Sequence, residues 1–278
     1  MVGAFAAMAA KLLKNQFFRR IDFVARRQII SVFALTAHKT YGYPVFSFCH
    51  TRYYSKDKED PQTLQNGPKW HILVIENLHN SFMKRKSVIE RNTNETKIAA
   101  SLTVDGTGKR KIDTPIGFLN HMLDLFAKHG LFDLSVKARG DTQIDEHHTV
   151  EDIGIVLGSA FAKALGEKTG IRRYGFFILP MDETLATVAV DFAGRYSFQF
   201  NCPFAREKVG DLSTELVSHF WDAFAQHAKI NLHIKVENGG NEHHKIEGIF
   251  KATARAIRMA CEIDPRAKKG IPSTKGKL

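Results

Sequence analysis

Two copies of one five-residue motif decide the fold of this chain. The first copy spans His147–Glu151 (HHTVE), and the second, 96 residues later, spans His243–Glu247 (HHKIE). Each copy opens a segment in which apolar residues recur with the period of a helix, at Ile153–Ala164 and at Ile249–Ala260. The sequence therefore predicts two equivalent helices, each with a histidine-rich first turn.

The motif combines the side chains that bind divalent metal ions. On a helix the first histidine and the glutamate share a face, whereas the second histidine lies about 100° around from the first. Neutral imidazole and carboxylate are usual ligands of zinc and manganese. Two divergent imidazoles beside one carboxylate suit two ions, or one ion shared with another part of the protein. Adjacent histidines also occur on solvated helix starts, but a second copy at the same helix position favours metal binding.

The repeat extends beyond this motif. Residues 119–129 match residues 217–227 at a spacing of 98, with a histidine at His121 in one segment and at His219 in the other. Strand-like runs follow both segments, and a Glu-Thr pair precedes them in each half. Each half therefore contains strands, a histidine-bearing helix, a further strand and the HHxxE helix.

This order predicts an α+β fold made of internally duplicated half-domains. The hydrophobic faces of two half-sheets are expected to pack on shared helices, since helices follow strands without a long βαβ alternation. We expect a first half-repeat at 88–180 and a second at 181–278.

The residues before these repeats have a different composition. The formal net charge is +11, but residues 1–56 contain nine lysines and arginines and one acid, so the remainder carries only about +3. The charge therefore gives no support for a nucleic-acid partner. Residues 1–55 are arginine-containing and acid-poor, which is typical of an organellar transit peptide, and their longest apolar run is too short to span a membrane. Residues 56–87 are polar and are expected to be a linker.

Three scattered cysteines, Cys49, Cys202 and Cys261, exclude a disulfide framework and a cysteine metal site. Any metal would be held by nitrogen and oxygen.

Several residues outside the motif are candidates for substrate chemistry. Glu95 precedes a predicted strand and fits either a general base or an ordinary exposed glutamate. Arg172-Arg173, in a glycine-bounded loop, suits a phosphate or a carboxylate, although surface arginine pairs are common. The segment 271–276 (IPSTKG) offers hydroxyls, a lysine and flexible backbone amides to an anion.

These segments, in this order, resemble the imidazoleglycerol-phosphate dehydratase family of histidine biosynthesis. The resemblance covers roughly residues 88–278, and one departure from many relatives is Leu125 in place of glutamine. The matching segments are 118–124 (FLNHMLD), 141–152 (DTQIDEHHTVED), 173–175, 180–183, 209–212, 214–220, 231–234, 241–247 and 271–276.

The resemblance implies a manganese-dependent hydro-lyase that removes water from imidazole glycerol phosphate to give imidazole acetol phosphate. It implies two Mn²⁺ ions per subunit, bound where subunits of a 24-subunit homo-oligomer meet. The internal repeat pairs the implied metal ligands one to one: His121, His147, His148 and Glu151 with His219, His243, His244 and Glu247.

The resemblance also implies substrate contacts and catalytic groups, which come from both halves of the repeat. The substrate contacts are Glu95, His121, Arg173, Arg195, Lys251, Ser273, Thr274 and Lys275. Glu95 is the candidate base for the carbon-bound proton, with Asp182 and Glu183 as possible assistants. The resemblance favours the plastid as the destination of the leader, with the mitochondrion or the cytoplasm as alternatives. The rival functions are a metal-dependent hydrolase that uses the same ligands and a metal-storing scaffold.

Overall fold

The computed structural model describes residues 85–267 and 270–278, and two short strands nearer the N-terminus, β1 (Ile21–Ala25) and β2 (Gln28–Val32). These two strands pair antiparallel within a compact unit formed by residues 1–78, and residues 79–278 form a second compact unit. Apart from the two strands, the expected leader at 1–55 and nearly all of the expected linker at 56–87 lie outside the described residues.

The second unit contains the expected duplication. The first half runs through β3 (Lys86–Asn92), β4 (Thr96–Thr103), β5 (Arg110–Asp113), α3 (Gly117–Gly130), β6 (Asp133–Gly140) and α4 (His147–Leu165). The second half repeats it with β7 (Tyr174–Met181), β8 (Thr184–Asp191), β9 (Ser197–Asn201), α5 (Glu215–Ala228), β12 (Asn231–Asn238) and α6 (Glu242–Cys261). A small hairpin, β10 (Lys208–Val209) and β11 (Leu212–Ser213), occurs in the second half.

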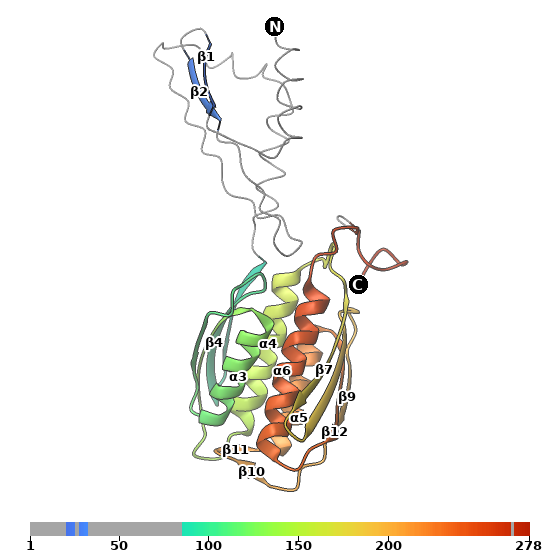
Figure 1. Cartoon of the computed structure of the whole chain (residues 1–278). Coiled ribbons are helices and arrows are strands. Elements are labelled where there is room, and N and C mark those ends of the chain that lie inside the picture. The colour runs from blue at the N-terminus through green and yellow to red at the C-terminus, as the bar shows by residue number, and fades with distance from the viewer. Residues whose placement is uncertain (1–20, 26–27, 33–84, 268–269) are drawn as a thin grey trace. The chain divides into compact units, whose positions relative to one another are not determined.

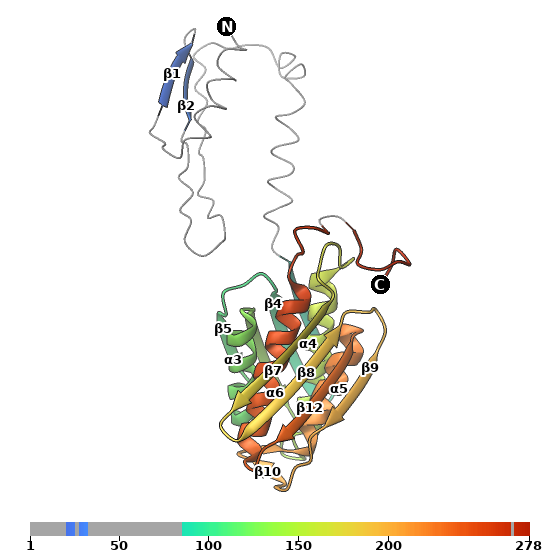
Figure 2. The ribbon, with the colours of Figure 1, turned by 45° about the vertical axis from the view of Figure 1, so that its right-hand side comes forward.

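The two sheets have the same topology, which confirms the α+β class and the repeat. The strand orders are β3-β4-β6-β5 and β7-β8-β12-β9, and in each sheet the last pair is parallel while the others are antiparallel. Since β7, which lies along β8 in Figure 2, is the counterpart of β3, the second half begins near Tyr174. The boundary expected at 180/181 therefore falls inside β7, just before its last residue Met181. Residues 110–113 form the short strand β5, which pairs parallel with β6.

The four helices form a central layer that is covered by one sheet on each side (Figure 1). The strands present alternate side chains to the helices, so that Ile98, Ala100 and Leu102 of β4 are buried while the residues between them are exposed. Phe126, Phe161 and other aromatic rings from all four helices interlock between the sheets. One hydrophobic core is therefore shared by both halves.

Small residues let α4 and α5 approach closely. A Cβ atom at Gly154 would lie 2.6 Å from the carbonyl oxygen of Phe220, and one at Gly158 would lie 2.3 Å from that of Phe224. Both positions therefore require glycine, because a side chain would clash with the backbone of α5. This close approach packs α4 against a helix of the other half of the repeat.

Cys202 and Cys261 are both buried, and neither forms a disulfide.

Within residues 85–267 and 270–278, no helix is both long and apolar enough to cross a bilayer.

Candidate metal centres and active site

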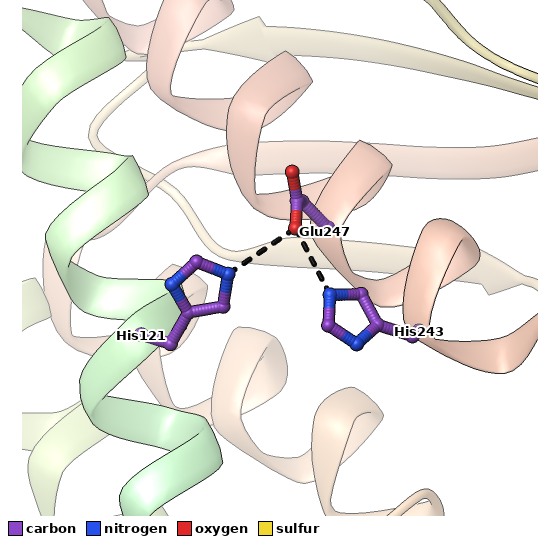
Figure 3. A group of neighbouring side chains, drawn as sticks. All are labelled: His121, His243 and Glu247. Carbon is purple, nitrogen blue, oxygen red and sulfur yellow. Dashed lines mark hydrogen bonds and ion pairs between the residues drawn. The ribbon is translucent and has the colours of Figure 1, made fainter.

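The first histidine and the glutamate of the second motif form a compact cluster with His121. The Nε2 atoms of His243 and His121 lie 3.1 Å and 3.3 Å from Oε2 of Glu247 (Figure 3). The three ligand atoms lie within 4.8 Å of one another. Phe118 packs edge-on against the His243 ring, with 5.0 Å between centroids. Two imidazole nitrogens and one carboxylate oxygen thus converge on a single point beside an apolar wall.

The first motif forms the corresponding cluster with His219. The His147 and His219 rings lie 5.0 Å apart between centroids, and Nε2 of His147 lies 3.9 Å from Oε2 of Glu151. This cluster is more open than the first, but it contains the same residue types on the equivalent helices.

Each cluster combines helices from both halves of the repeat. His121 is on α3 of the first half, whereas His243 and Glu247 are on α6 of the second half. Conversely, His219 of α5 joins the first-half helix α4. Packing of α3 on α6 and of α4 on α5 therefore assembles the clusters, and neither half contains a complete cluster alone.

The second histidine of each motif points to different partners. Nδ1 of His148 lies 3.1 Å from Oδ2 of Asp141 and 3.8 Å from Oε2 of Glu95. The hydrogen bond with Asp141 raises the pKa of His148. The two imidazoles of this motif therefore serve separate groups of carboxylates, in the divergent directions that helical spacing predicts.

His244 has the equivalent surroundings. Its Nδ1 lies 2.9 Å from Oε2 of Glu183, and its Nε2 lies 3.7 Å from Oδ2 of Asp182. Hydrogen bonds from His244 and from the backbone amides of Asn241 and Gly240 lower the pKa of Glu183 to about 2. Glu183 is therefore a weak base that fixes the orientation of His244. Its counterpart Glu95 is more exposed and makes a longer contact with its histidine.

Residues just before each motif accept hydrogen bonds from the first turns of α4 and α6. The His147 backbone N–H donates to Oδ1 of Asp145, and the His243 N–H donates to Oδ1 of Asn241. Asp145 thus binds the first turn of α4, whereas Glu146 accepts hydrogen bonds from Ser213.

The candidate phosphate contacts lie at three places. The Arg173 guanidinium pairs with Asp191, with Nε 2.7 Å from Oδ1, and it donates to the carbonyl oxygen of Pro272 at 2.9 Å. Lys251 forms an ion pair with Oε1 of Glu247. Arg195, Thr274 and Lys275 are exposed, and the Oγ of Ser273 accepts from the backbone N–H of Lys275.

These places are distributed along the length of α6. His243 is in its first turn, Lys251 is two turns later, and the Arg173 N–H donates to the carbonyl oxygen of Ala260 in its last turn. Seventeen residues of helix separate His243 from Ala260, which is about 25 Å at about 1.5 Å per residue. Within one chain, Arg173 and the cluster of His243 therefore lie at opposite ends of α6, too far apart to contact the same small molecule.

Sequence reasoning did not assign roles to three aspartates that organise the site. Asp141 orients His148, Asp191 holds Arg173, and Asp211 binds the start of α3. Asp141 lies seven residues before His148, so their closeness in the sequence could have indicated that they interact. The others come from distant parts of the chain and needed the tertiary structure.

The fold and the clusters define a class of protein, a duplicated α+β unit with paired histidine–carboxylate sites on a shared layer of helices. Comparison with protein families supports a narrower assignment. A model of the family described as imidazoleglycerol-phosphate dehydratase matches residues 114–257. The chain belongs to this family. It is a hydro-lyase of histidine biosynthesis that dehydrates imidazole glycerol phosphate to imidazole acetol phosphate.

Similar proteins are matched over nearly their whole length. The imidazoleglycerol-phosphate dehydratase of Rhodopirellula baltica is 57% identical over 199 residues, which are 72% of this chain and 98% of the relative. That of Polynucleobacter asymbioticus is 54% identical over 194 residues, which are 70% of this chain and 100% of the relative.

Solved structures of the same enzyme share the fold. The crystal structure of the Staphylococcus aureus enzyme has a TM-score of 0.59 and 41% identity, and the match covers 64% of this chain and 99% of that one. That of the Pyrococcus furiosus enzyme, in complex with (S)-C348, has a TM-score of 0.59 and 32% identity, over 68% of this chain and 100% of that one.

Proposed function

We propose that the dehydratase activity depends on two Mn²⁺ ions per chain, one at each histidine–carboxylate cluster. The donor sets support this, because His121, His243 and Glu247 converge as two imidazoles and one carboxylate. His219, His147 and Glu151 offer the same residue types on the equivalent helices, at wider spacing. Mixed nitrogen and oxygen donors suit a divalent transition metal. Bound Mn²⁺ would act as a Lewis acid that stabilises the deprotonated imidazole ring, whose electrons can then expel the adjacent hydroxyl.

We further propose that His148 and His244 serve as metal ligands between chains. Within one chain these two imidazoles are paired with their own carboxylates, away from the histidines that precede them. Three protein ligands in each cluster leave coordination positions for a neighbouring histidine and for the substrate ring. This arrangement supports a homo-oligomer, of 24 subunits if it follows the family.

The length of α6 supports the proposal that each active site is formed by residues of two chains. About 25 Å of helix separates His243 from the backbone contact of Arg173, which exceeds the reach of a single glycerol phosphate side chain. A substrate bound at the clusters of one chain would therefore meet the Arg173 end of another. We propose that Arg173 and the segment 271–276 with Ser273, Thr274 and Lys275 bind the phosphate, with Arg195 and Lys251 as further cationic contacts.

We propose Glu95 as the base that accepts the carbon-bound proton. Its side chain is 54% exposed and lies at the β3–β4 turn, 3.8 Å from His148, so it is free to meet a substrate. The reaction would break one C–O bond and one C–H bond, and the resulting enol would tautomerise to the ketone. Glu183 accepts hydrogen bonds from the Gly240 and Asn241 amides and contacts His244, so it would position His244, with Asp182 beside it. The phosphate clamp would hold the reacting carbons in place.

Turnover of imidazole glycerol phosphate by the full-length chain tests the manganese proposal. Chelation should abolish activity, and added Mn²⁺ should restore it with two ions bound per chain. Two bound ions without turnover would overturn the mechanism and favour a hydrolase or a storage scaffold.

Two variants separate metal binding from proton transfer. Glu95→Gln should lower kcat by at least about 100-fold while it keeps both ions, because it removes only the base. Glu90→Gln, in the exposed part of β3, is the matched control and should leave kcat unchanged. Full activity of Glu95→Gln would exclude this residue as the base.

We propose that residues 1–55 direct the chain to an organelle, with the plastid as the destination. The arginine-rich, acid-poor composition supports a transit peptide. The bacterial relatives point away from a plastid, so this proposal depends on the composition of the leader alone. Residues 1–84 fused to a fluorescent protein should enter plastids in a plant cell, and uptake by mitochondria or retention in the cytoplasm would contradict the proposal.

A further inference from the structure

The two halves differ in the segment that leads into their first helix. Residues 114–116 join β5 to α3, whereas residues 202–214, which include β10 and β11, join β9 to α5. We call residues 202–214 the clasp. Its hairpin turns at Gly210-Asp211, where Gly210 has a φ of +61°, a conformation that glycine adopts without strain. The clasp has no counterpart in the first half, so the duplication does not account for it.

The clasp is anchored to the starts of two metal-binding helices. Glu146, just before α4, accepts from the backbone N–H of Ser213 at 2.9 Å. Its repeat counterpart Glu242, the first residue of α6, accepts from the backbone N–H of Ala205 at 2.7 Å. Both glutamates are buried, and each directly precedes the paired histidines of its motif. The two ends of the clasp are thus fixed to α4 and to α6.

The tip of the clasp caps a third helix. Oδ1 of Asp211 accepts from the backbone N–H of Phe118 at 2.9 Å, and Oδ2 accepts from that of Gly117 at 2.5 Å. The residue at the N-cap position of α3 is Ile116, which offers no side-chain acceptor. In contrast, the first turns of α4 and α6 donate to residues next to them in sequence. The first turn of α3 therefore depends on a residue from the other half of the repeat.

The hydrogen bonds of Asp211 lie one turn before His121, the residue of this cluster that comes from α3. His243 and Glu247 are four residues apart on one helix, so α6 itself fixes their relative positions. His121 reaches them from α3, as Figure 3 shows, and its distance from Glu247 follows from where α3 begins. Phe118, whose amide Asp211 binds, also packs against the His243 ring. The clasp thus contacts both sides of the cluster.

We propose that Asp211 is a positioning residue, which sets the placement of His121 relative to His243 and Glu247 by clasping α3 to α6. This inference rests on the manganese site proposed above. A residue that orients a metal ligand commonly changes metal affinity by about 10- to 100-fold when it is removed. Because Asp211 acts on His121 through the helix, we expect the lower end of this range and an effect on only one of the two ions.

The test is Mn²⁺ binding by the full-length chain, with free Mn²⁺ counted by electron paramagnetic resonance. Asp211→Ala should weaken one of the two ions about ten-fold. Asp211→Asn keeps an acceptor oxygen and should lose less than about three-fold. The matched control is Asp133→Ala, because Oδ1 of Asp133 accepts from the backbone amides of Thr107 and Lys109 at the far end of α3. This control should lower the melting temperature without changing Mn²⁺ affinity.

Hydrogen exchange in the metal-free protein gives a second readout. The amides of Gly117 and Phe118 should both exchange faster in Asp211→Ala, whereas in Asp211→Asn, which keeps one acceptor oxygen, one of the two should stay close to the unchanged rate. Equal Mn²⁺ affinity of Asp211→Ala and the unchanged chain would overturn the inference, as would equal losses in the alanine and asparagine variants. If the unchanged chain binds no Mn²⁺, the metal site itself is refuted. If Asp211→Ala fails to fold, the asparagine variant decides: faster exchange of one of the two amides with a loss of Mn²⁺ affinity below about three-fold supports the cap, and a ten-fold loss or unchanged exchange of both amides overturns it.

Discussion

Replacing Gly158 with alanine should force α4 and α5 apart. The new Cβ would lie 2.3 Å from the carbonyl oxygen of Phe224 and 2.9 Å from the amide nitrogen of Ala228. Both are backbone atoms, which cannot rotate away, so relief requires one helix to move by about 1 Å. Such overpacking costs about 1–3 kcal/mol, and here the upper part of that range applies. The better helix propensity of alanine offsets up to about 1 kcal/mol.

The net effect is a free energy of unfolding lowered by about 2 kcal/mol, or a melting temperature lowered by about 4–8 °C for a unit of this size. Melting should be compared at one protein concentration, because assembly contributes to stability. Gly248→Ala on α6 is the matched control, since its Cβ would meet Ala186 and Thr184 at an ordinary 3.5 Å. It should leave the melting temperature unchanged or raise it slightly.

The same displacement should weaken one cluster selectively. His147 is on α4 and His219 is on α5, so separation of these helices should weaken Mn²⁺ binding at their cluster while the cluster of His121 keeps its affinity. Calorimetric titration with Mn²⁺ would resolve the two ions. An unchanged melting temperature in Gly158→Ala, or equal weakening of both ions, would refute the reasoning.

Three further predictions follow from other contacts. Burial raises the pKa of Glu146, but hydrogen bonds from Ser213 outweigh it and lower the pKa to about 2. That shift from 4.5 corresponds to about 3 kcal/mol, reduced by solvent screening to on the order of 1 kcal/mol. This stability is present above pH 4.5 and is lost as the pH falls toward 2, so the melting-temperature gap between Glu146→Gln and the unchanged chain should close over that range; a constant gap would contradict it. Arg173→Lys cannot reproduce the forked pairing with Asp191, and steady-state kinetics should show KM raised about ten-fold with kcat changed less; a fall in kcat alone would argue against phosphate binding. His219→Asn should reduce bound Mn²⁺ from two ions to one, and retention of both would remove this residue from the ligand set.

Much of the fold could be read from the sequence because it is duplicated. The two HHxxE motifs and the apolar periodicity after them identified α4 and α6, and strand alternation identified β4. Short strands were harder to assign. β5 has only four residues and pairs along β6, so local pattern could not separate it from a turn. β7 follows a glycine-bounded loop, and only its pairing with β8 assigns it to the second half.

The sequence itself contains a signal for the clasp. Glu95 and Glu183 are separated by 88 residues, whereas His121 and His219 are separated by 98. The change in spacing locates ten extra residues between β9 and α5. Their role could not follow from spacing, because the hydrogen bonds of Asp211 join it to residues more than 90 positions away.

The sequence by itself determined which residue types are present for the chemistry and that they occur in two equivalent sets. Helical geometry alone separates the two histidines of each motif onto different faces, and this is a local property. Only the tertiary structure decided which residues meet. His121 joins Glu247, and His147 joins His219, because helix packing crosses between the halves. Contacts between helices depend on side-chain and backbone fit across the whole core, which no local pattern encodes.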